Sequence, residues 1–175
     1  MAARRGSAAA EPDTITDPVD WAAHFWQEQG LNGDESGFLA LTSLLRLERL
    51  VVDAAERELR QVDLHLTDYL MLMTLQLSSS GTRLISSLAR NLMVHATTAT
   101  LAVDRLEARG LLARSPHPTD RRATCVSITP TGRELSSRAT TALDQISFGL
   151  HGNSPHSIER LRIALTEARR SAGDT

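Results

Sequence analysis

The feature that most constrains the fold is a change in the spacing of apolar residues at Gly110. Upstream of this glycine, apolar residues recur at intervals of three and four, which is typical of amphipathic helices. Downstream, residues 111–115 and 123–129 alternate apolar and polar side chains on either side of a Pro-His-Pro-Thr-Asp loop, which indicates a β-hairpin. Helical spacing returns at Pro130, which follows an N-capping threonine. We therefore expect a mainly α-helical protein with one small β-hairpin.

The helices expected from these spacings begin and end at recognisable residues. The first follows Asp20 as its N-cap and stops at Gly30, and the third follows Thr67 as its N-cap. The aromatic residues of the first helix pack either on their own subunit or against a partner, and the sequence leaves both open. The seven expected helices span residues 21–29, 36–62, 68–77, 85–92, 97–109, 130–148 and 157–170.

Composition excludes several classes of protein. Residues 1–18 are rich in alanine and have no apolar periodicity, so they are predicted to be a disordered tail. We expect a cytoplasmic protein with no membrane span, because the chain has neither a run of about eighteen apolar residues nor the apolar stretch of a signal peptide. Cys125 is the single cysteine and cannot form an intramolecular disulfide. On a wing strand, it is expected to face outwards or pack passively rather than to sense oxidants.

Charge is distributed unevenly along the chain. The formal net charge is −2, which argues against indiscriminate coating of nucleic acid. Between Arg83 and Arg122, however, seven arginines face three acidic residues, a local balance of +4 that leaves −6 for the remainder. All 19 basic residues of the chain are arginine, so the position of an arginine carries more information than its presence.

Two short helices joined by a tight turn and followed at once by a hairpin form the layout of a winged helix-turn-helix. The helix at 97–109 would be the recognition helix, and its first turns would present threonine hydroxyl and methyl groups to the major groove. The hairpin tip would place two arginines near the phosphate backbone or in the minor groove, where an aspartate could orient one of them. The predicted DNA-binding residues are Thr97, Thr98, Thr100, Asp120, Arg121 and Arg122.

Residues 84–135 resemble the core of the MarR family of bacterial transcriptional regulators. The resemblance rests on VDRLEARGLL at 103–112, TDRRA at 119–123 and ITPTGREL at 128–135, which stand in the order and spacing of the family. It implies wings that grip the minor groove, a palindromic operator, and often repression relieved by a small ligand or an oxidant. It also implies a homodimer built by N- and C-terminal helices.

With this resemblance, the chain divides into four predicted parts. Residues 1–18 are the tail, residues 19–62 carry N-terminal dimerisation helices, residues 63–130 form the winged helix-turn-helix core, and residues 131–175 carry C-terminal dimerisation helices. The expected function is that of a sequence-specific regulator, acting as a repressor on double-stranded DNA as a homodimer, with a small-molecule effector of unknown identity.

Two residues depart from the family pattern. Met93 stands where the family commonly has the glycine of the helix-helix turn, so either the turn avoids positive φ or it carries strain of about 1 kcal/mol. Leu101 stands at a position of the recognition helix that is often arginine, which removes a contact to phosphate or guanine. Weaker DNA binding than is typical of the family is the expected consequence.

Other functions find less support in the sequence. There is no Gly-rich phosphate loop, no nucleophile elbow and no paired-carboxylate pattern, so an enzyme is not expected. The six histidines show no recognised metal spacing, and neither a metal nor a cofactor is predicted. For Arg105 and Arg109, the sequence favours neither contact with DNA phosphates nor pairing with acidic residues over the other. The rival from another class is a dimeric winged-helix module that binds proteins or sequesters ligands without binding DNA.

Overall fold

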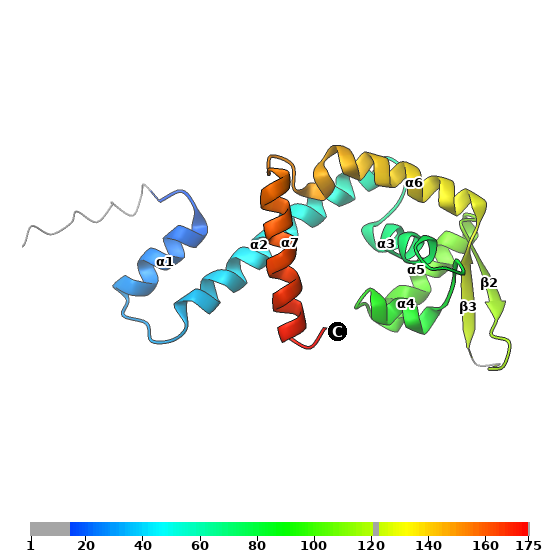
Figure 1. Ribbon diagram of the computed structural model, residues 1–175, viewed down its shortest axis with the longest axis horizontal. Helices are drawn as coiled ribbons and strands as arrows, with labels where there is room; N and C mark the ends of the chain where they lie inside the picture. The colour runs from blue at the N-terminus through cyan, green and yellow to red at the C-terminus, as the bar shows by residue number, and fades with distance from the viewer. Residues whose placement is uncertain (1–14, 121–122, 175) are drawn as a thin grey trace, which may run out of the picture. The chain divides into compact units, whose positions relative to one another are not determined.

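The computed structural model describes residues 15–120 and 123–174, and the described chain is mainly helical with one small sheet (Figure 1). The fold class predicted from the sequence is thereby confirmed. The elements in order are α1 (Pro18–Glu28), α2 (Glu35–Arg60), α3 (Leu66–Gln76), β1 (Thr82–Leu84), α4 (Ile85–Asn91), α5 (Ala96–Ala108), β2 (Leu112–Pro116), β3 (Thr124–Ile128), α6 (Pro130–Gln145), a 3-10 turn η2 (Ser147–Gly149) and α7 (Pro155–Ser171). The chain forms two compact units that meet between Leu50 and Val51, within α2.

The N-terminal unit contains α1 and the first half of α2. Asp17 is the N-cap of α1, because its carboxylate accepts hydrogen bonds from the backbone N–H of Val19 at 2.7 Å and of Asp20 at 3.2 Å. The predicted cap at Asp20 is therefore wrong, and the predicted tail ends too late, since the helix already begins at Pro18. Residues 1–14 of that tail lie outside the described residues. The ring of Trp26 packs against Phe38 of α2, with centroids 5.1 Å apart.

The start of α3 also differs from the prediction. His65, not Thr67, is its N-cap, and the helix includes Leu66 as its first residue. One distant and one local contact fix this start: Glu56 of α2 accepts a hydrogen bond from the N–H of Leu66 at 2.7 Å, and Asp68 accepts one from the N–H of His65 at 3.4 Å. A side chain ten residues away thus satisfies one of the backbone donors at the start of α3.

The sheet is antiparallel in the order β1-β3-β2. The predicted hairpin is present, with Leu112 opposite Ile128 and Pro116 opposite Thr124. The third strand, β1, was not predicted, because three residues are too few to show alternation. It adds to the free edge of β3, and the hydroxyls of Thr82 and Ser127 lie 2.7 Å apart across this pairing.

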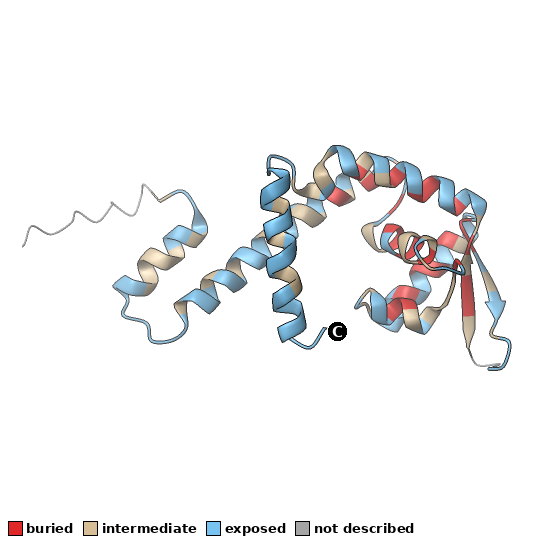
Figure 2. Ribbon diagram, viewed as in Figure 1, coloured by how far each residue is buried: buried red, intermediate tan, exposed pale blue. Residues whose placement is uncertain are grey.

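One apolar core lies among α3, α4, α5, α6, the sheet and the end of α2 (Figure 2). Within α5, the buried side chains come from helix positions spaced by three and four, as the sequence predicted. The buried residues of α5 are Ala99, Ala102, Val103 and Leu106. By contrast, neither α1 nor α7 has a buried residue. Helix α6 ends at Gln145, three residues before the predicted end, because Ser147 and Phe148 adopt positive φ.

Among the described residues, no helix is long and apolar enough to cross a membrane.

Candidate nucleic-acid interface

The turn between α4 and α5 is closed by backbone hydrogen bonds. The N–H of Met93 donates to the carbonyl of Arg90, and the N–H of Val94 donates to that of Ala89, each at 3.0 Å. This is the bonding of a helix end in which the residue after the cap is left-handed, and Met93 has a φ of 52°. Of the two alternatives that the sequence left for Met93, the structure thus has positive φ, which costs a non-glycine residue about 1 kcal/mol.

The three predicted threonines lie together at the start of α5. His95 is the N-cap, and Thr97, Thr98 and Thr100 are all exposed on the first turns. The opposite side of the helix is buried in the core, so packing of α5 fixes which face points outwards. A rigid, outward-facing first turn is the part of a recognition helix that approaches base edges.

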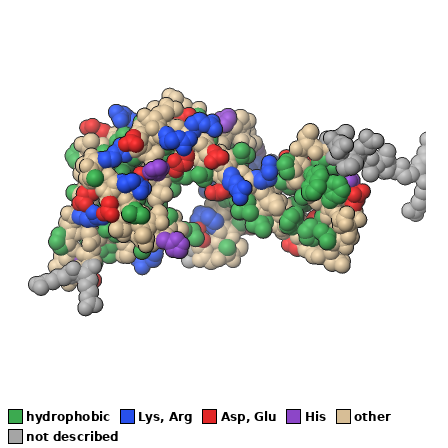
Figure 3. All heavy atoms as spheres, turned by 180° about the vertical axis from the view of Figure 1, so that it is seen from behind, with side chains coloured by type: hydrophobic (Ala, Val, Ile, Leu, Met, Phe, Trp, Pro, Cys, Tyr) green, Lys and Arg blue, Asp and Glu red, His purple; other side chains and the backbone are tan. Residues whose placement is uncertain are grey.

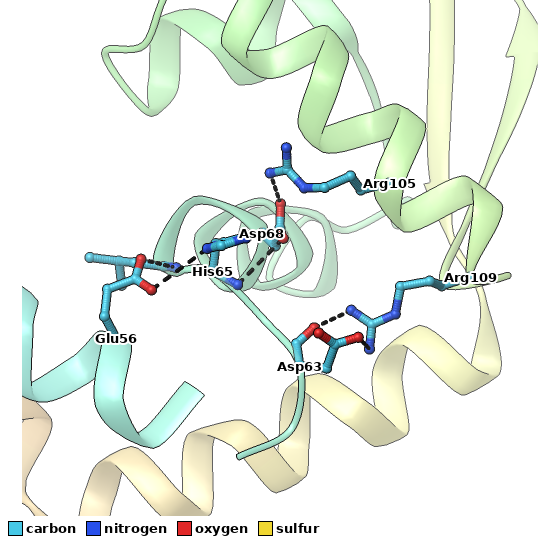
Figure 4. Close-up of polar contacts among 7 residues, drawn as sticks. Glu56, Asp63, His65, Asp68, Arg105 and Arg109 are labelled. Carbon is cyan, nitrogen blue, oxygen red and sulfur yellow. Dashed lines mark hydrogen bonds and ion pairs between the residues drawn. The ribbon is translucent and has the colours of Figure 1, made fainter. Parts of the chain in front are cut away.

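The charged residues at the end of α5 are tied to neighbouring segments (Figure 4). Arg105 donates to the buried carboxylate of Asp68 on α3 at 2.7 Å. Arg109, just after α5, donates to the backbone carbonyl of Asp63 and lies 3.6 Å from the carboxylate of the same residue. The question that the sequence left even is answered for both arginines: each pairs with an acid of the same chain.

Arg114 of β2 pairs with both acids of the recognition helix. Its guanidinium donates to Asp104 at 2.5 Å and to Glu107. The hydrogen bond to Asp104, together with that to Glu107, raises the pKa of Arg114 above its ordinary value, against the opposing effect of desolvation. Arg114 thereby offsets one of the two negative charges on a surface that would otherwise repel phosphate more strongly.

These ion pairs change the meaning of the local charge balance. Three of the seven arginines counted between residues 83 and 122 are engaged by acids, two of which lie upstream of that segment. On the face seen in Figure 3, basic and acidic side chains are interspersed over this unit. The sequence overestimated the free positive charge, because a count along the chain cannot see partners that lie far away in sequence.

The wing loop is held together by His117, a loop residue to which the sequence analysis gave no role. Nδ1 of His117 accepts hydrogen bonds from the backbone N–H of Asp120 at 3.2 Å and of Thr119 at 3.4 Å. The N–H of His117 in turn donates to the carbonyl of Ala123 at 3.1 Å, which closes the loop. Asp120 is exposed at the tip. Arg121 and Arg122 lie outside the described residues.

Residues 15–120 and 123–174 offer little support for a metal site or a reactive cysteine. There, no group of three or more His, Cys, Asp or Glu side chains is placed to hold a metal ion. Cys125 is buried on β3, where its backbone lies opposite Leu84 and Ser115. Of its two predicted placements, outward and passively packed, the structure has the second.

Comparisons with known proteins agree with this geometry. The family model described as MarR family matches residues 64–124. The structure of Sco5413, a MarR family transcriptional regulator from Streptomyces coelicolor, is 32% identical, covers 81% of this chain and 98% of its own, and superposes with a TM-score of 0.74. CouR from Rhodococcus jostii RHA1, solved with p-coumaroyl-CoA, is 26% identical over 77% of this chain and 92% of its own, with a TM-score of 0.63.

A MarR variant from E. coli, solved in complex with operator DNA, shares the fold at 17% identity, over 78% of this chain and 99% of its own, with a TM-score of 0.65. No curated protein matches the chain. With its recognition helix, its wing and its likeness to Sco5413, the chain belongs to the MarR family of transcriptional regulators.

Proposed function

We propose that this protein is a sequence-specific DNA-binding repressor that binds a pseudo-palindromic operator as a homodimer. The observation that carries the proposal is the outward face at the start of α5, where Thr97, Thr98 and Thr100 are exposed on a helix whose opposite side is locked in the core. Hydroxyl and methyl groups in this position suit base edges and phosphates of the major groove. Repression follows if the bound dimer covers a promoter.

The wing residues Asp120, Arg121 and Arg122 complete the proposed interface. Guanidinium groups are attracted by the negative potential of the minor groove, and an adjacent carboxylate can hold one in a fixed pose. The proposal needs these two arginines, since three other arginines near the recognition helix are occupied by Asp68, Asp63, and the pair Asp104 and Glu107.

Exposed apolar residues support the homodimer. On α2, three leucines of the first half, Leu41, Leu44 and Leu45, lie on the same helical face as the buried Ala55 and Leu59 of the second half, and yet they are about half exposed. Figure 3 shows hydrophobic side chains gathered over the N-terminal unit. These exposed residues are Phe38, Leu41, Leu44 and Leu45. A second copy of the chain would cover them.

In this proposal, residues 19–62 and 131–175 form the dimer and residues 63–130 bind DNA. Two recognition helices then enter successive major grooves about 34 Å apart, at a spacing that the dimer helices set. A small effector that changes this spacing would change affinity for the operator. CouR, solved with p-coumaroyl-CoA, is a relative that supports such control.

Fluorescence anisotropy with the upstream intergenic DNA at several salt concentrations tests the proposal. Wild-type protein is expected to bind sequence-specifically, with affinity that falls steeply with salt because phosphate contacts release counterions. The double variant Arg121→Ala, Arg122→Ala removes four cations per dimer and should reduce the steepness of log K against log salt by about 3.6. The matched control Arg4→Ala, Arg5→Ala removes the same charge from residues 1–18, outside the proposed dimer and DNA-binding segments, and should leave the slope unchanged.

Two outcomes would contradict the proposal. If neither the upstream DNA nor any fragment from a genomic selection binds at low salt, the protein is an interaction module rather than a DNA-binding regulator. If both double variants lower the slope equally, binding is nonspecific attraction to positive charge and the wing has no special part in it.

A further inference from the structure

The outward face of α5 is unusually apolar for a helix that approaches DNA. At helical spacing, Thr97, Leu101 and Asp104 form the line directly opposite the buried residues. Leu101 lies one turn after Thr97 and is 53% exposed. The centre of this face is thus an isobutyl group between a threonine and a carboxylate.

The neighbouring side chains add more methyl groups than free polar groups. The hydroxyl of Thr100 donates to the backbone carbonyl of Ala96 at 2.9 Å, so its hydrogen is already used within the helix. The side chain of Ala96 is itself an exposed methyl group. Ala96, Thr100 and Leu101 therefore all offer methyl groups to a molecule that contacts this face.

No cation of α5 is left to recognise guanine. Arg105 is the one arginine between Ala96 and Ala108, and it is held by Asp68 at 2.7 Å. Asp104, the acid on the outward line, is held by Arg114 at 2.5 Å. Bidentate recognition of guanine by arginine, the commonest specific contact in the major groove, is therefore not available from this helix.

We propose that α5 recognises its operator through the 5-methyl groups of thymine, with Leu101 as the principal reading residue. The inference rests on the proposed DNA-binding function and specifies what the recognition helix binds. In the major groove, thymine is distinguished by its methyl group, and apolar side chains are the groups that contact it. Each half-site should then contain at least one thymine, at the position that faces Leu101.

Replacement of thymine by uracil tests this inference directly, because it deletes one methyl group and leaves base pairing intact. Each thymine of the bound operator is replaced in turn in both half-sites, and the dissociation constant is measured by fluorescence anisotropy. Loss of a buried methyl group weakens binding about fourfold per half-site. At least one position per half-site should show this loss. An operator in which every thymine is uracil, bound as tightly as the original, would overturn the inference.

A protein variant assigns the reading to Leu101. In Leu101→Ala, uracil at the sensitive position should cost nothing further, because the contact has already been lost. The control Leu77→Ala removes a leucine just after α3 that is even more exposed, at 78%, and should retain the full uracil effect. If Leu101→Ala loses affinity but keeps the uracil effect, another residue reads the methyl group and the assignment fails.

The two levels of the argument fail in different ways. Absence of sequence-specific binding to any DNA would overturn both the proposed function and this inference. Specific, salt-dependent binding that is indifferent to every thymine methyl would overturn the inference alone.

Discussion

Along one face of α2, Leu41, Leu44 and Leu45 are about half exposed, whereas Ala55 and Leu59 further along the same face are buried in the winged core. The periodicity is continuous, so the two halves of the helix differ in their partners and not in their pattern. The second half contributes to the core of its own chain, and its Glu56 accepts a hydrogen bond from the N–H of Leu66 of α3. For the first half, the difference indicates a missing partner, which we propose is a second copy of the chain.

The largest expected effect tests whether burial within the winged core stabilises the folded protein. Leu106→Ala removes a fully buried leucine of α5 and should lower the free energy of unfolding by about 3 kcal/mol, since it leaves a cavity. Urea denaturation at one fixed protein concentration measures it. Leu101→Ala, on the exposed side of the same helix, is the matched control and should cost less than about 0.5 kcal/mol. Equal losses would contradict the burial seen in the core.

The next prediction concerns the open half of α2. Leu44→Glu should weaken dimer association by about a hundredfold, because each of two copies loses a buried leucine and gains a charge at the interface. Sedimentation equilibrium measures the dissociation constant. Ser43→Glu places the same charge on the other side of the helix and should leave association nearly unchanged. A dimer of Leu44→Glu as tight as that of wild type would place the interface elsewhere.

The same contrast separates what could be predicted from sequence from what could not. The period of apolar residues gave α5 and its buried face, because helix packing repeats every three to four residues. The hairpin was predictable from the alternation of apolar and polar residues. The exposure of Thr97, Thr98 and Thr100 follows from the same helical periodicity that gave the buried face of α5. These are features that depend on neighbours in the chain.

Features that depend on distant residues were not predictable. The pair of Arg105 with Asp68 joins residues 37 apart, and the cap of α3 depends on Glu56 in another helix. The strand β1 forms by pairing with the open edge of β3, and the residues Thr82–Leu84 carry no pattern that predicts a strand. Without these partners, the sequence assigned too much free charge to the recognition helix and placed the start of α3 too late.

A smaller effect on stability is expected from a polar contact of the second half of α2. Glu56→Ala leaves the N–H of Leu66 without its acceptor and should lower the free energy of unfolding by about 1–2 kcal/mol. Asp53→Ala is the matched control: Asp53 is exposed on another side of α2 and has no polar partner among the described residues, so its loss should cost less than about 0.5 kcal/mol. Thermal unfolding of both variants measures the difference, and equal midpoints would contradict it.

The smallest expected effect concerns backbone strain, which also divides the two units. In the described residues before Val51, positive φ occurs at glycines alone, whereas in the unit after it Asp63, Met93, Ser147 and Phe148 adopt positive φ. A residue remains in a strained conformation when its surroundings determine it, and a closed core provides such surroundings. Strain is therefore tolerated in the unit that packs on itself.

Met93→Gly should relieve this strain and raise the free energy of unfolding by up to about 1 kcal/mol, since the side chain is 82% exposed and little packing is lost. Asp63→Gly is the matched control: aspartate tolerates this conformation better, and its carboxylate faces Arg109 at 3.6 Å, so the same change should not stabilise. Chemical denaturation of both variants decides. If Met93→Gly destabilises the protein, the apolar stem of Met93 contributes more through packing than its backbone loses through strain, and the turn of the helix-turn-helix depends on that side chain.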